Sequence, residues 1–359
     1  MSKENNYCVI MAGGIGSRFW PMSRTSYPKQ FIDVLGTGQT LIQQTFERLE
    51  KLAPRENIYV VTNELYRQLV LDQLSVNEDQ VICEPNRRNT APCIAYANYK
   101  IAKKNPEANI IVAPADHLIL KEDKFVSVME TALEFTSKND ALVTLGISPT
   151  RPDTGYGYIQ FDDSNDDAIK KVKTFTEKPN LELASKFLKS GDFSWNSGMF
   201  IWSLSSISKA FKTHLPEIDQ LFQEKIDAFN TNQEQQAIDD IYAVSKSVSI
   251  DYGVMEKADN VYVISADIGW SDLGTWGSIY THLDHDKKHN AIIGKNVIMY
   301  ESEECIVSVP KEKLVVLQGL KGYIVVESND TLLICRKSDE QKIKQIVTDI
   351  KLEKGDKYV

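Results

Sequence analysis

The chain has 359 residues, of which 42% are hydrophobic and 25% are charged, proportions that are ordinary for a globular protein. Its formal net charge is −9 at pH 7, which argues against broad nucleic-acid binding, because that affinity depends on many Lys and Arg contacts to phosphate. No apolar run approaches the roughly 20 residues that cross a bilayer, and the first six residues are polar, unlike a secretory signal. We therefore expect a cytoplasmic protein, in which a few local cations could still bind a small phosphorylated substrate.

Short, continuously apolar runs recur in the first half of the chain and predict strands that are buried on both faces. These runs are residues 7–11, 58–61, 80–83, 109–113 and 141–145. Amphipathic stretches between them predict helices at residues 40–52, at 90–101 with Thr90 as the N-cap, and at 123–136. This alternation predicts an α/β, Rossmann-like fold with a mixed, mainly parallel sheet, in which ligands bind beyond the carboxyl ends of the strands.

The second half of the chain has a mixed pattern of strands and helices. Strands are expected at residues 156–161 and 171–175, and helices at 181–188, 207–215 and 233–244. A polar stretch at residues 284–290 predicts a linker between a catalytic domain of residues 1–283 and a small domain of residues 291–359. The small domain is expected to be β-rich and to end in a helix. The widely spaced cysteines form no CxxC pair and the histidines form no HExxH, so neither a disulfide framework nor a zinc site is predicted.

A glycine-rich segment directly follows the first predicted strand. Gly13, Gly14 and Gly16 would let the backbone approach a polyphosphate and donate N–H groups to it. Ser17, the next residue, is also expected to contact the nucleotide. Arg18 could add a forked cation for phosphate oxygens. The simpler alternative is a glycine-rich turn between a strand and a helix. The third glycine of GxGxxG is missing and no GxxxxGK[ST] occurs, which argues against a dinucleotide-dependent oxidoreductase and against a P-loop.

Lys29 follows Pro28 shortly after this segment. A lysine held there could contact an α-phosphate and offset the charge that develops as a pentavalent phosphorus forms. Most single lysines are solvated surface groups, so this interpretation depends on the glycine-rich segment.

Together these residues resemble a known family. The segments GGIGSRFWPMSR (13–24) and YPKQF (27–31) resemble the signature of sugar-nucleotide pyrophosphorylases, and the WP and PKQ forms resemble the mannose-1-phosphate guanylyltransferases in that family. Further matching segments, in the family's order, are EPNRRNTAP (84–92), PADH (114–117), TGYGYI (154–159), FTEKP (175–179), WNSGMF (195–200), SIDYGVME (249–256) and GWSDLGTW (269–276).

The resemblance implies roles for the residues around the phosphates. It implies that the three glycines bind the triphosphate, that Arg18 contacts the leaving diphosphate, and that Lys29 contacts the α-phosphate. It also implies that Asp116 and Asp272 hold Mg²⁺, an ion that typically takes one or two carboxylates and completes its shell with phosphates and water. Asp116 lies just past the strand predicted at residues 109–113, where such a sheet binds its ligands. A turn or N-cap aspartate is the alternative for each.

Glu84 is the candidate reader of the base. Guanine presents N1–H and N2–H₂ donors, and a carboxylate can accept from both, whereas a uracil or thymine edge offers only one such donor. We expect Glu84, or the backbone through Asn89, to recognise guanine.

For the sugar phosphate, the resemblance implies Gly157, Glu177, Lys178 and Asn196. Glu177 can accept from sugar hydroxyls, Lys178 can pair with the phosphate, and Asn196 can both donate and accept. An ordinary exposed charge pair is the alternative for Glu177 and Lys178.

The reaction implied by the resemblance is GTP plus mannose 1-phosphate giving GDP-mannose plus diphosphate. Two alternatives remain open. One is the same reaction on another pair, such as glucose 1-phosphate with UTP or dTTP, and the other is a non-catalytic sugar-nucleotide sensor. The relatives also imply a homodimer formed with the help of a C-terminal unit resembling a short left-handed β-helix.

Overall fold

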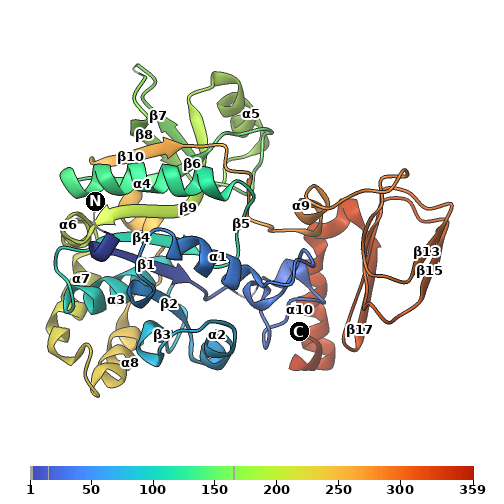
Figure 1. Cartoon of the computed structure of the whole chain (residues 1–359), viewed down its shortest axis with the longest axis horizontal. Coiled ribbons are helices and arrows are strands. Elements are labelled where there is room, and N and C mark those ends of the chain that lie inside the picture. The colour runs from blue at the N-terminus through green and yellow to red at the C-terminus, as the bar shows by residue number, and fades with distance from the viewer. Residues whose placement is uncertain (1–2, 15, 165) are drawn as a thin grey trace. The chain divides into compact units, whose positions relative to one another are not determined.

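The computed structural model describes residues 3–14, 16–164 and 166–359 (Figure 1). The chain packs as two compact units, and neither is continuous in sequence. The first unit comprises Met1–Gly13, Thr45–Ala115 and Ile119–Trp270, and the second comprises Gly14–Gln44, Asp116–Leu118 and Ser271–Val359. Asp116 and the glycine-rich segment from Gly14 onward thus pack with the C-terminal residues, whereas Gly13 belongs to the first unit. The domain boundary expected at residues 284–290 stays a prediction.

The first unit is built on a nine-stranded sheet with the order β3-β2-β1-β4-β9-β6-β10-β8-β7. The strands are β1 (Asn6–Met11), β2 (Ile58–Asn63), β3 (Val81–Glu84), β4 (Asn109–Pro114), β6 (Leu142–Ile147), β7 (Tyr158–Phe161), β8 (Ile169–Thr176), β9 (Phe193–Ser203) and β10 (Val261–Ser265). Strands β1 to β4 pair in parallel, and β10 is parallel to β6. The carboxyl ends of β1, β3 and β4 therefore share one edge, and Glu84 and Pro114 lie at that edge.

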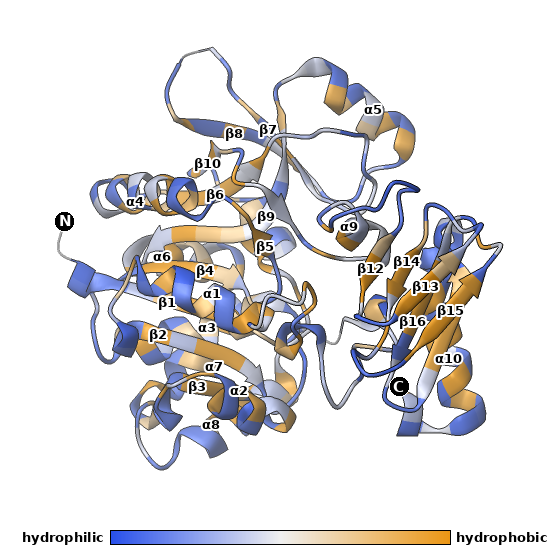
Figure 2. Cartoon of the chain, turned by 45° about the vertical axis from the view of Figure 1, so that its right-hand side comes forward, coloured by the Kyte–Doolittle hydropathy of each residue, from blue (hydrophilic) through white to orange (hydrophobic). Residues whose placement is uncertain are grey.

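Helices accompany the sheet: α1 (Leu41–Glu50), α2 (Arg67–Gln73), α3 (Thr90–Ala102), α4 (Glu122–Lys138), α5 (Leu181–Ser190), α6 (Leu204–His214), α7 (Pro216–Glu224) and α8 (Glu234–Val244). One apolar cluster joins alternate strand residues, such as Tyr7 and Val9, to α3, α6, α7 and α8. The intervening Cys8 and Ile10 are also fully buried, outside that cluster. Burial on both faces explains why these strands have continuous apolar sequences. Their hydrophobic residues are orange in Figure 2.

Four elements of the first unit were not expected from the sequence: β9, β10, α2 and α7. Strand β9 runs antiparallel between β4 and β6, with Ile201 opposite both Ile111 and Val143. Its first half contains Asn196, Ser197 and Gly198, which hide the strand pattern. The N-cap prediction was wrong by one residue, because Asn89 caps α3 and its side chain accepts from the Thr90 backbone N–H.

The second unit contains the C-terminal strands. Strands β12 (Ala291–Ile293), β14 (Ile306–Ser308) and β16 (Tyr323–Ser328) pair in parallel, and β17 (Thr331–Arg336) closes this sheet antiparallel to β16. Strands β13 (Val297–Tyr300) and β15 (Val315–Gln318) form a second parallel pair. Equivalent positions of successive coils therefore stack on one another, as in a β-helix. The helices of this unit are α9 (Trp276–Tyr280) and α10 (Ile343–Lys354).

Candidate functional site

The glycine-rich segment of the second unit is shaped around Lys29. Gly16 has a φ of 66°, in the left-handed region, and caps a short 3-10 helix, Ser17–Phe19. A Cβ added at Gly16 would lie 2.7 Å from the Lys29 Cβ and 3.2 Å from the Ser23 Oγ. Both the backbone conformation and the space therefore require glycine. Gln30, for which no role was expected, donates from its Nε2 to the Gly14 carbonyl at 3.0 Å.

Lys29 is the centre of a polar cluster in the second unit. The residue is only 3% exposed, so the alternative of a solvated surface lysine is excluded. Its Nζ lies 2.8 Å from Asp116 Oδ2 and donates to the Asp272 carbonyl at 2.8 Å and the Leu273 carbonyl at 3.3 Å. It also lies 5.5 Å from the centre of the Phe19 ring. A buried ammonium needs such partners, and these join three segments that are far apart in sequence.

The two aspartates predicted to hold a metal both contact Lys29, Asp116 through its carboxylate and Asp272 through its backbone carbonyl. Burial raises the pKa of Asp116, but the charges of Lys29 and His117 outweigh it and hold that pKa below its usual range. Asp272 lies in a tight turn, where its Oδ1 accepts from the Gly274 backbone N–H at 3.0 Å. A Cβ on Gly274 would lie 2.6 Å from Asp272 Oδ2, so glycine at this position leaves room for the Asp272 carboxylate in the turn.

Arg18 is exposed on the 3-10 helix of the glycine-rich segment. It forms no ion pair with any residue that the structure describes. Its guanidinium can therefore meet a phosphate without first breaking an internal ion pair.

In the first unit, Glu84 ends β3 and is buried, with 6% of its surface exposed. Its Oε1 accepts from the Tyr242 hydroxyl at 2.8 Å, and a Cβ added at Gly13 would lie 3.8 Å from its Oε2. Burial raises the pKa of Glu84 to about 7, although Tyr242 and Arg87 act in the opposite direction. The carboxyl is thus close to its ionisation midpoint near neutral pH. The nearby Asn89 has a φ of 68°, an uncommon conformation for a non-glycine residue.

The four predicted sugar-phosphate residues lie together in the first unit. The Asn196 backbone N–H donates to the Gly157 carbonyl at 2.8 Å, and a Cβ on Gly157 would lie 2.6 Å from Glu177 Oε2. Lys178 pairs with Glu177. Gly157 therefore lets the Glu177 carboxylate approach the backbone closely.

Asp251 joins this group, although no role was expected for it from the sequence. Its Oδ1 accepts from Asn196 Nδ2 at 2.7 Å. Burial raises the pKa of Asp251, and the Glu177 carboxylate raises it further. Asp251 is far from Asn196 in sequence, so their contact could not be read from the sequence. The SIDYG segment that contains Asp251 was the only sequence signal that pointed to this residue.

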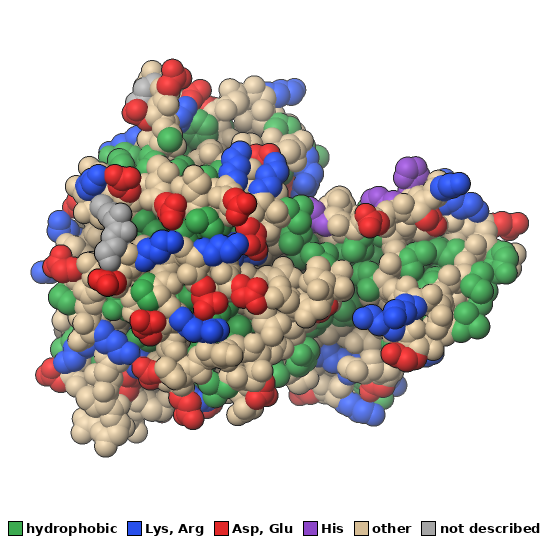
Figure 3. Space-filling view, in the orientation of Figure 1, with side chains coloured by type: hydrophobic (Ala, Val, Ile, Leu, Met, Phe, Trp, Pro, Cys, Tyr) green, Lys and Arg blue, Asp and Glu red, His purple; other side chains and the backbone are tan. Residues whose placement is uncertain are grey.

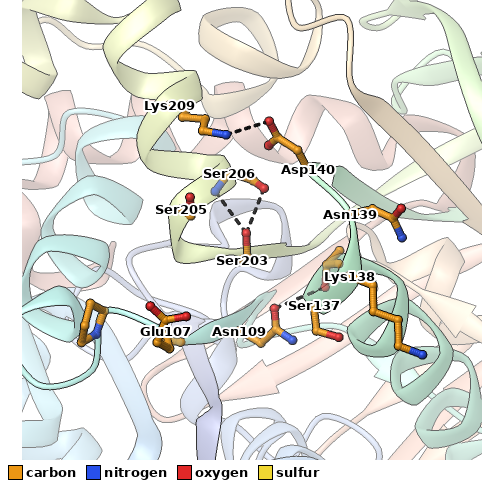
Figure 4. A pocket seen from close by; sticks show the side chains of 13 residues that line it. Glu107, Asn109, Ser137, Lys138, Asn139, Asp140, Ser203, Ser205, Ser206 and Lys209 are labelled. Carbon is orange, nitrogen blue, oxygen red and sulfur yellow. Dashed lines mark hydrogen bonds and ion pairs between the residues drawn. The ribbon is translucent and has the colours of Figure 1, made fainter.

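A cavity of about 360 Å³ lies elsewhere in the first unit, at the amino ends of β4 and β6 (Figure 4). Its walls include Asn109, Asp140, Ser203, Ser206 and Lys209. These polar groups bind one another: Lys209 Nζ lies 3.0 Å from Asp140 Oδ2, and the Ser203 hydroxyl donates to Ser206 Oγ at 2.8 Å. None of the predicted site residues lines this cavity.

Neither a preformed metal cluster nor a membrane-spanning helix is found among the described residues. They contain no group of three or more His, Cys, Asp and Glu side chains arranged to hold a metal ion. Within the same described ranges, no helix combines the length and apolarity needed to cross a membrane.

Comparisons with known proteins bear on the whole chain. Residues 7–289 match the nucleotidyl transferase family, and residues 295–350 match the MannoseP isomerase/GMP-like beta-helix domain. The chain is 38% identical over 361 residues to the mannose-1-phosphate guanylyltransferase of Salmonella montevideo, covering 98% of this chain and 75% of that protein. It is 35% identical over 354 residues to an Escherichia coli mannose-1-phosphate guanylyltransferase, covering 96% of this chain and 75% of the relative.

A solved structure agrees with these matches. The crystal structure of mannose-1-phosphate geranyltransferase from Thermus thermophilus superposes with a TM-score of 0.87 at 28% identity, over 97% of this chain and 99% of that one. The predicted α/β fold with a β-rich C-terminal part is thereby confirmed. The family match covers nearly all of the large sheet, together with Glu84, Lys29, Asp116 and Asp272. The chain therefore belongs to the nucleotidyl transferase family of enzymes.

Proposed function

We propose that the chain transfers a guanylyl group from GTP to mannose 1-phosphate, giving GDP-mannose and diphosphate. The observation that carries the proposal is the buried Lys29, whose ammonium joins Asp116 to the Asp272 turn. That cluster lies in a chain whose relatives at 35% and 38% identity are mannose-1-phosphate guanylyltransferases.

The chemistry needs positioning and charge neutralisation more than proton transfer. An oxygen of the sugar phosphate attacks the α-phosphorus of GTP, a new P–O bond forms, and the bond to the β-phosphate oxygen breaks in line with it. The attacking oxygen is already anionic near pH 7, so no general base is required. Lys29 would offset charge at the α-phosphorus, and Arg18 would offset charge on the leaving diphosphate. Backbone N–H groups of Gly13, Gly14 and Gly16, with Ser17, would hold the triphosphate.

The two aspartates of the polar cluster around Lys29 suit Mg²⁺. Asp116 and Asp272 supply carboxylate oxygens, which this hard cation prefers, and substrate phosphates and water would complete its shell. Bound there, Mg²⁺ would neutralise phosphate charge. Lys29 pairs with Asp116 in the structure and would exchange that contact for the α-phosphate.

Base and sugar are proposed to bind residues of the first unit. Glu84 would accept from guanine N1–H and N2–H₂, with backbone contacts through Asn89. Glu177 and Asn196 would bind the mannose hydroxyls beside Gly157, and the exposed Lys178 would pair with the sugar phosphate. The contact between Asn196 and Asp251 supports this assignment, because it fixes the side-chain amide of a residue whose backbone N–H donates to the Gly157 carbonyl.

We also propose a homodimer that uses the outer face of β13 and β15. Ile298 and Val316 are directly opposite in the register and are 44% and 54% exposed, and Tyr300, on the same side of β13, is 55% exposed. Hydrophobic side chains gather over this part of the surface in Figure 3. A face of this kind is unusual on a monomer and suits a second copy of the chain. The cytoplasmic location expected from the sequence stays a prediction.

The proposed reaction is tested by incubating the protein with Mg²⁺, GTP and mannose 1-phosphate, with inorganic pyrophosphatase removing diphosphate. Mass spectrometry should detect GDP-mannose, and chelation of the metal should abolish its formation. Absence of product from this pair and from glucose 1-phosphate with UTP or dTTP would favour the sensor instead.

A further inference from the structure

Tyr242 is the last buried residue of α8, and its side chain is fully buried. Its hydroxyl donates to Glu84 Oε1 at 2.8 Å, across a sequence separation of 158 residues. Neither the motifs nor the family resemblance singled out this residue. The contact lies entirely within the first unit.

The hydrogen bond acts on one of the two carboxylate oxygens. Oε1 is held by Tyr242, whereas Oε2 is the oxygen nearest to Gly13, at 3.8 Å from where a Cβ on that glycine would be. A carboxyl fixed at one oxygen cannot rotate freely about its terminal torsion, which is otherwise broad for glutamate. Tyr242 therefore sets the plane of the Glu84 carboxylate.

The chain that follows Tyr242 is tied to the loop that follows Glu84. The Tyr242 carbonyl accepts from Arg88 Nε at 3.1 Å, and the Val248 N–H donates to the Arg88 carbonyl at 3.3 Å. The Ala91 N–H donates to the Val248 carbonyl at 3.1 Å, and the Ile250 N–H donates to Thr90 Oγ1 at 2.9 Å. These four bonds fix the position of α8's end relative to Glu84 and its loop.

We propose that Tyr242 is the positioning residue for base selection, and that it tunes Glu84 to a purine carrying a 2-amino group. This inference rests on the proposed function. Guanine and hypoxanthine share the N1–H donor, and only guanine has the N2–H₂ donor. A carboxylate with a fixed plane can meet both donors of guanine, whereas a rotating carboxylate loses part of the second contact.

The electrostatics agree with this geometry. The ionisable groups around the Glu84 carboxyl are Tyr242 from α8, Cys93 from α3 and Arg87 from the loop after β3. The Tyr242 hydroxyl donates to the ionised form and so lowers a pKa that burial raises. Removing that hydroxyl should leave more of Glu84 protonated at neutral pH, and a protonated carboxyl has lost acceptor capacity.

The test compares Tyr242→Phe with the unsubstituted enzyme, using GTP and ITP as alternative substrates with mannose 1-phosphate. Because a hydrogen bond to a charged group is lost, Tyr242→Phe should lower the ratio of kcat/KM for GTP to kcat/KM for ITP by about tenfold. The acid limb of kcat/KM for GTP should also move to higher pH. A purely structural role for the ring would move neither quantity.

Tyr99→Phe is the matched control. Tyr99 is also a buried helical tyrosine whose hydroxyl donates to a carboxylate, Asp219 Oδ1, at 2.6 Å. The Tyr99→Phe variant should lower the melting temperature as Tyr242→Phe does, while leaving the GTP to ITP ratio of kcat/KM unchanged. An unaltered ratio and pH limb in Tyr242→Phe would overturn the inference. Failure of the unsubstituted enzyme to make GDP-mannose would instead overturn the proposed function.

Discussion

We expect Glu84 to give the proposed reaction a pH dependence that follows from the pKa of this one residue. Its pKa is raised to about 7 in the free protein, while two guanine donors favour the ionised carboxylate. GTP binding should therefore release a proton near neutral pH, and kcat/KM for GTP should fall as the pH decreases below about 7. Steady-state kinetics between pH 5.5 and 8.5, roughly one to two units on each side of that value, would check this.

Glu84→Gln provides the matching variant, because glutamine keeps the shape and loses the charge. Its acceptor count on this edge is halved, so the preference for GTP over other triphosphates should drop by about tenfold or more. The acid limb should disappear with the carboxyl. A Glu84→Gln enzyme with full GTP preference would contradict the base assignment.

The two aspartates proposed to hold Mg²⁺, Asp116 and Asp272, lead to a separate prediction. Asp116→Asn and Asp272→Asn should each lower kcat by about 100-fold or more, because oxyanion and metal charge stabilisation acts mainly in the transition state. Thermal unfolding should change less than kcat, because the Asp116 side chain is 30% exposed and an amide oxygen can still accept from the Lys29 ammonium, although that buried ammonium loses the charge of its partner. Unchanged turnover at saturating Mg²⁺ in both variants would refute the metal assignment.

Much of this group of residues could be predicted from sequence, for a definable reason. Gly16, Lys29 and Asp116 stand in short segments that directly follow buried strands or prolines, where motif and topology agree. Tyr242 could not be predicted, because it is an ordinary residue type in a helix outside every matching segment, and Asp251 was indicated only by the SIDYG segment that contains it. Their importance comes only from folding that brings them to Glu84 and Asn196.

At the scale of elements, the glycine-rich segment depends on close packing as much as on backbone freedom. Gly16→Ala adds a Cβ at 2.7 Å from Lys29 Cβ and also strains a left-handed residue. Gly36→Ala is the matched control, because Gly36 has a φ of 70° and open space around it. Both should cost about 1–2 kcal/mol from the left-handed conformation, and only Gly16→Ala should also displace Lys29 and lower kcat. Equal kcat values in the two variants would contradict a packing role for Gly16.

The strands and helices show where sequence patterns succeed. Strands β1, β2 and β4 are buried on both faces, and their continuous apolar runs are distinct. The first half of strand β9 contains the polar residues Ser194, Asn196 and Ser197, which interrupt its apolar pattern although Trp195 beside them is buried. The proposed sugar contact Asn196 thus lies in the part of the strand where the apolar pattern is weakest.

At the scale of the whole molecule, the apolar face of β13 and β15 predicts the oligomeric state. Ile298→Lys together with Val316→Lys should convert a dimer to a monomer, because the charges would be buried without partners in the interface. Leu352→Lys is a suitable control, since Leu352 is 81% exposed on α10, away from this strand pair in sequence. Sedimentation velocity would measure the mass, and a monomeric unsubstituted protein would contradict the proposed dimer.

The most direct test of guanylyl transfer to mannose 1-phosphate is a competition in one vessel. Equal concentrations of GTP, UTP and dTTP would be mixed with equal mannose 1-phosphate and glucose 1-phosphate, and early products would be quantified by mass spectrometry. The product ratios then report relative kcat/KM values directly. We predict that GDP-mannose dominates all other sugar nucleotides. Dominance of UDP-glucose or dTDP-glucose would contradict the assigned substrates and would leave the nucleotidyl transferase fold in place.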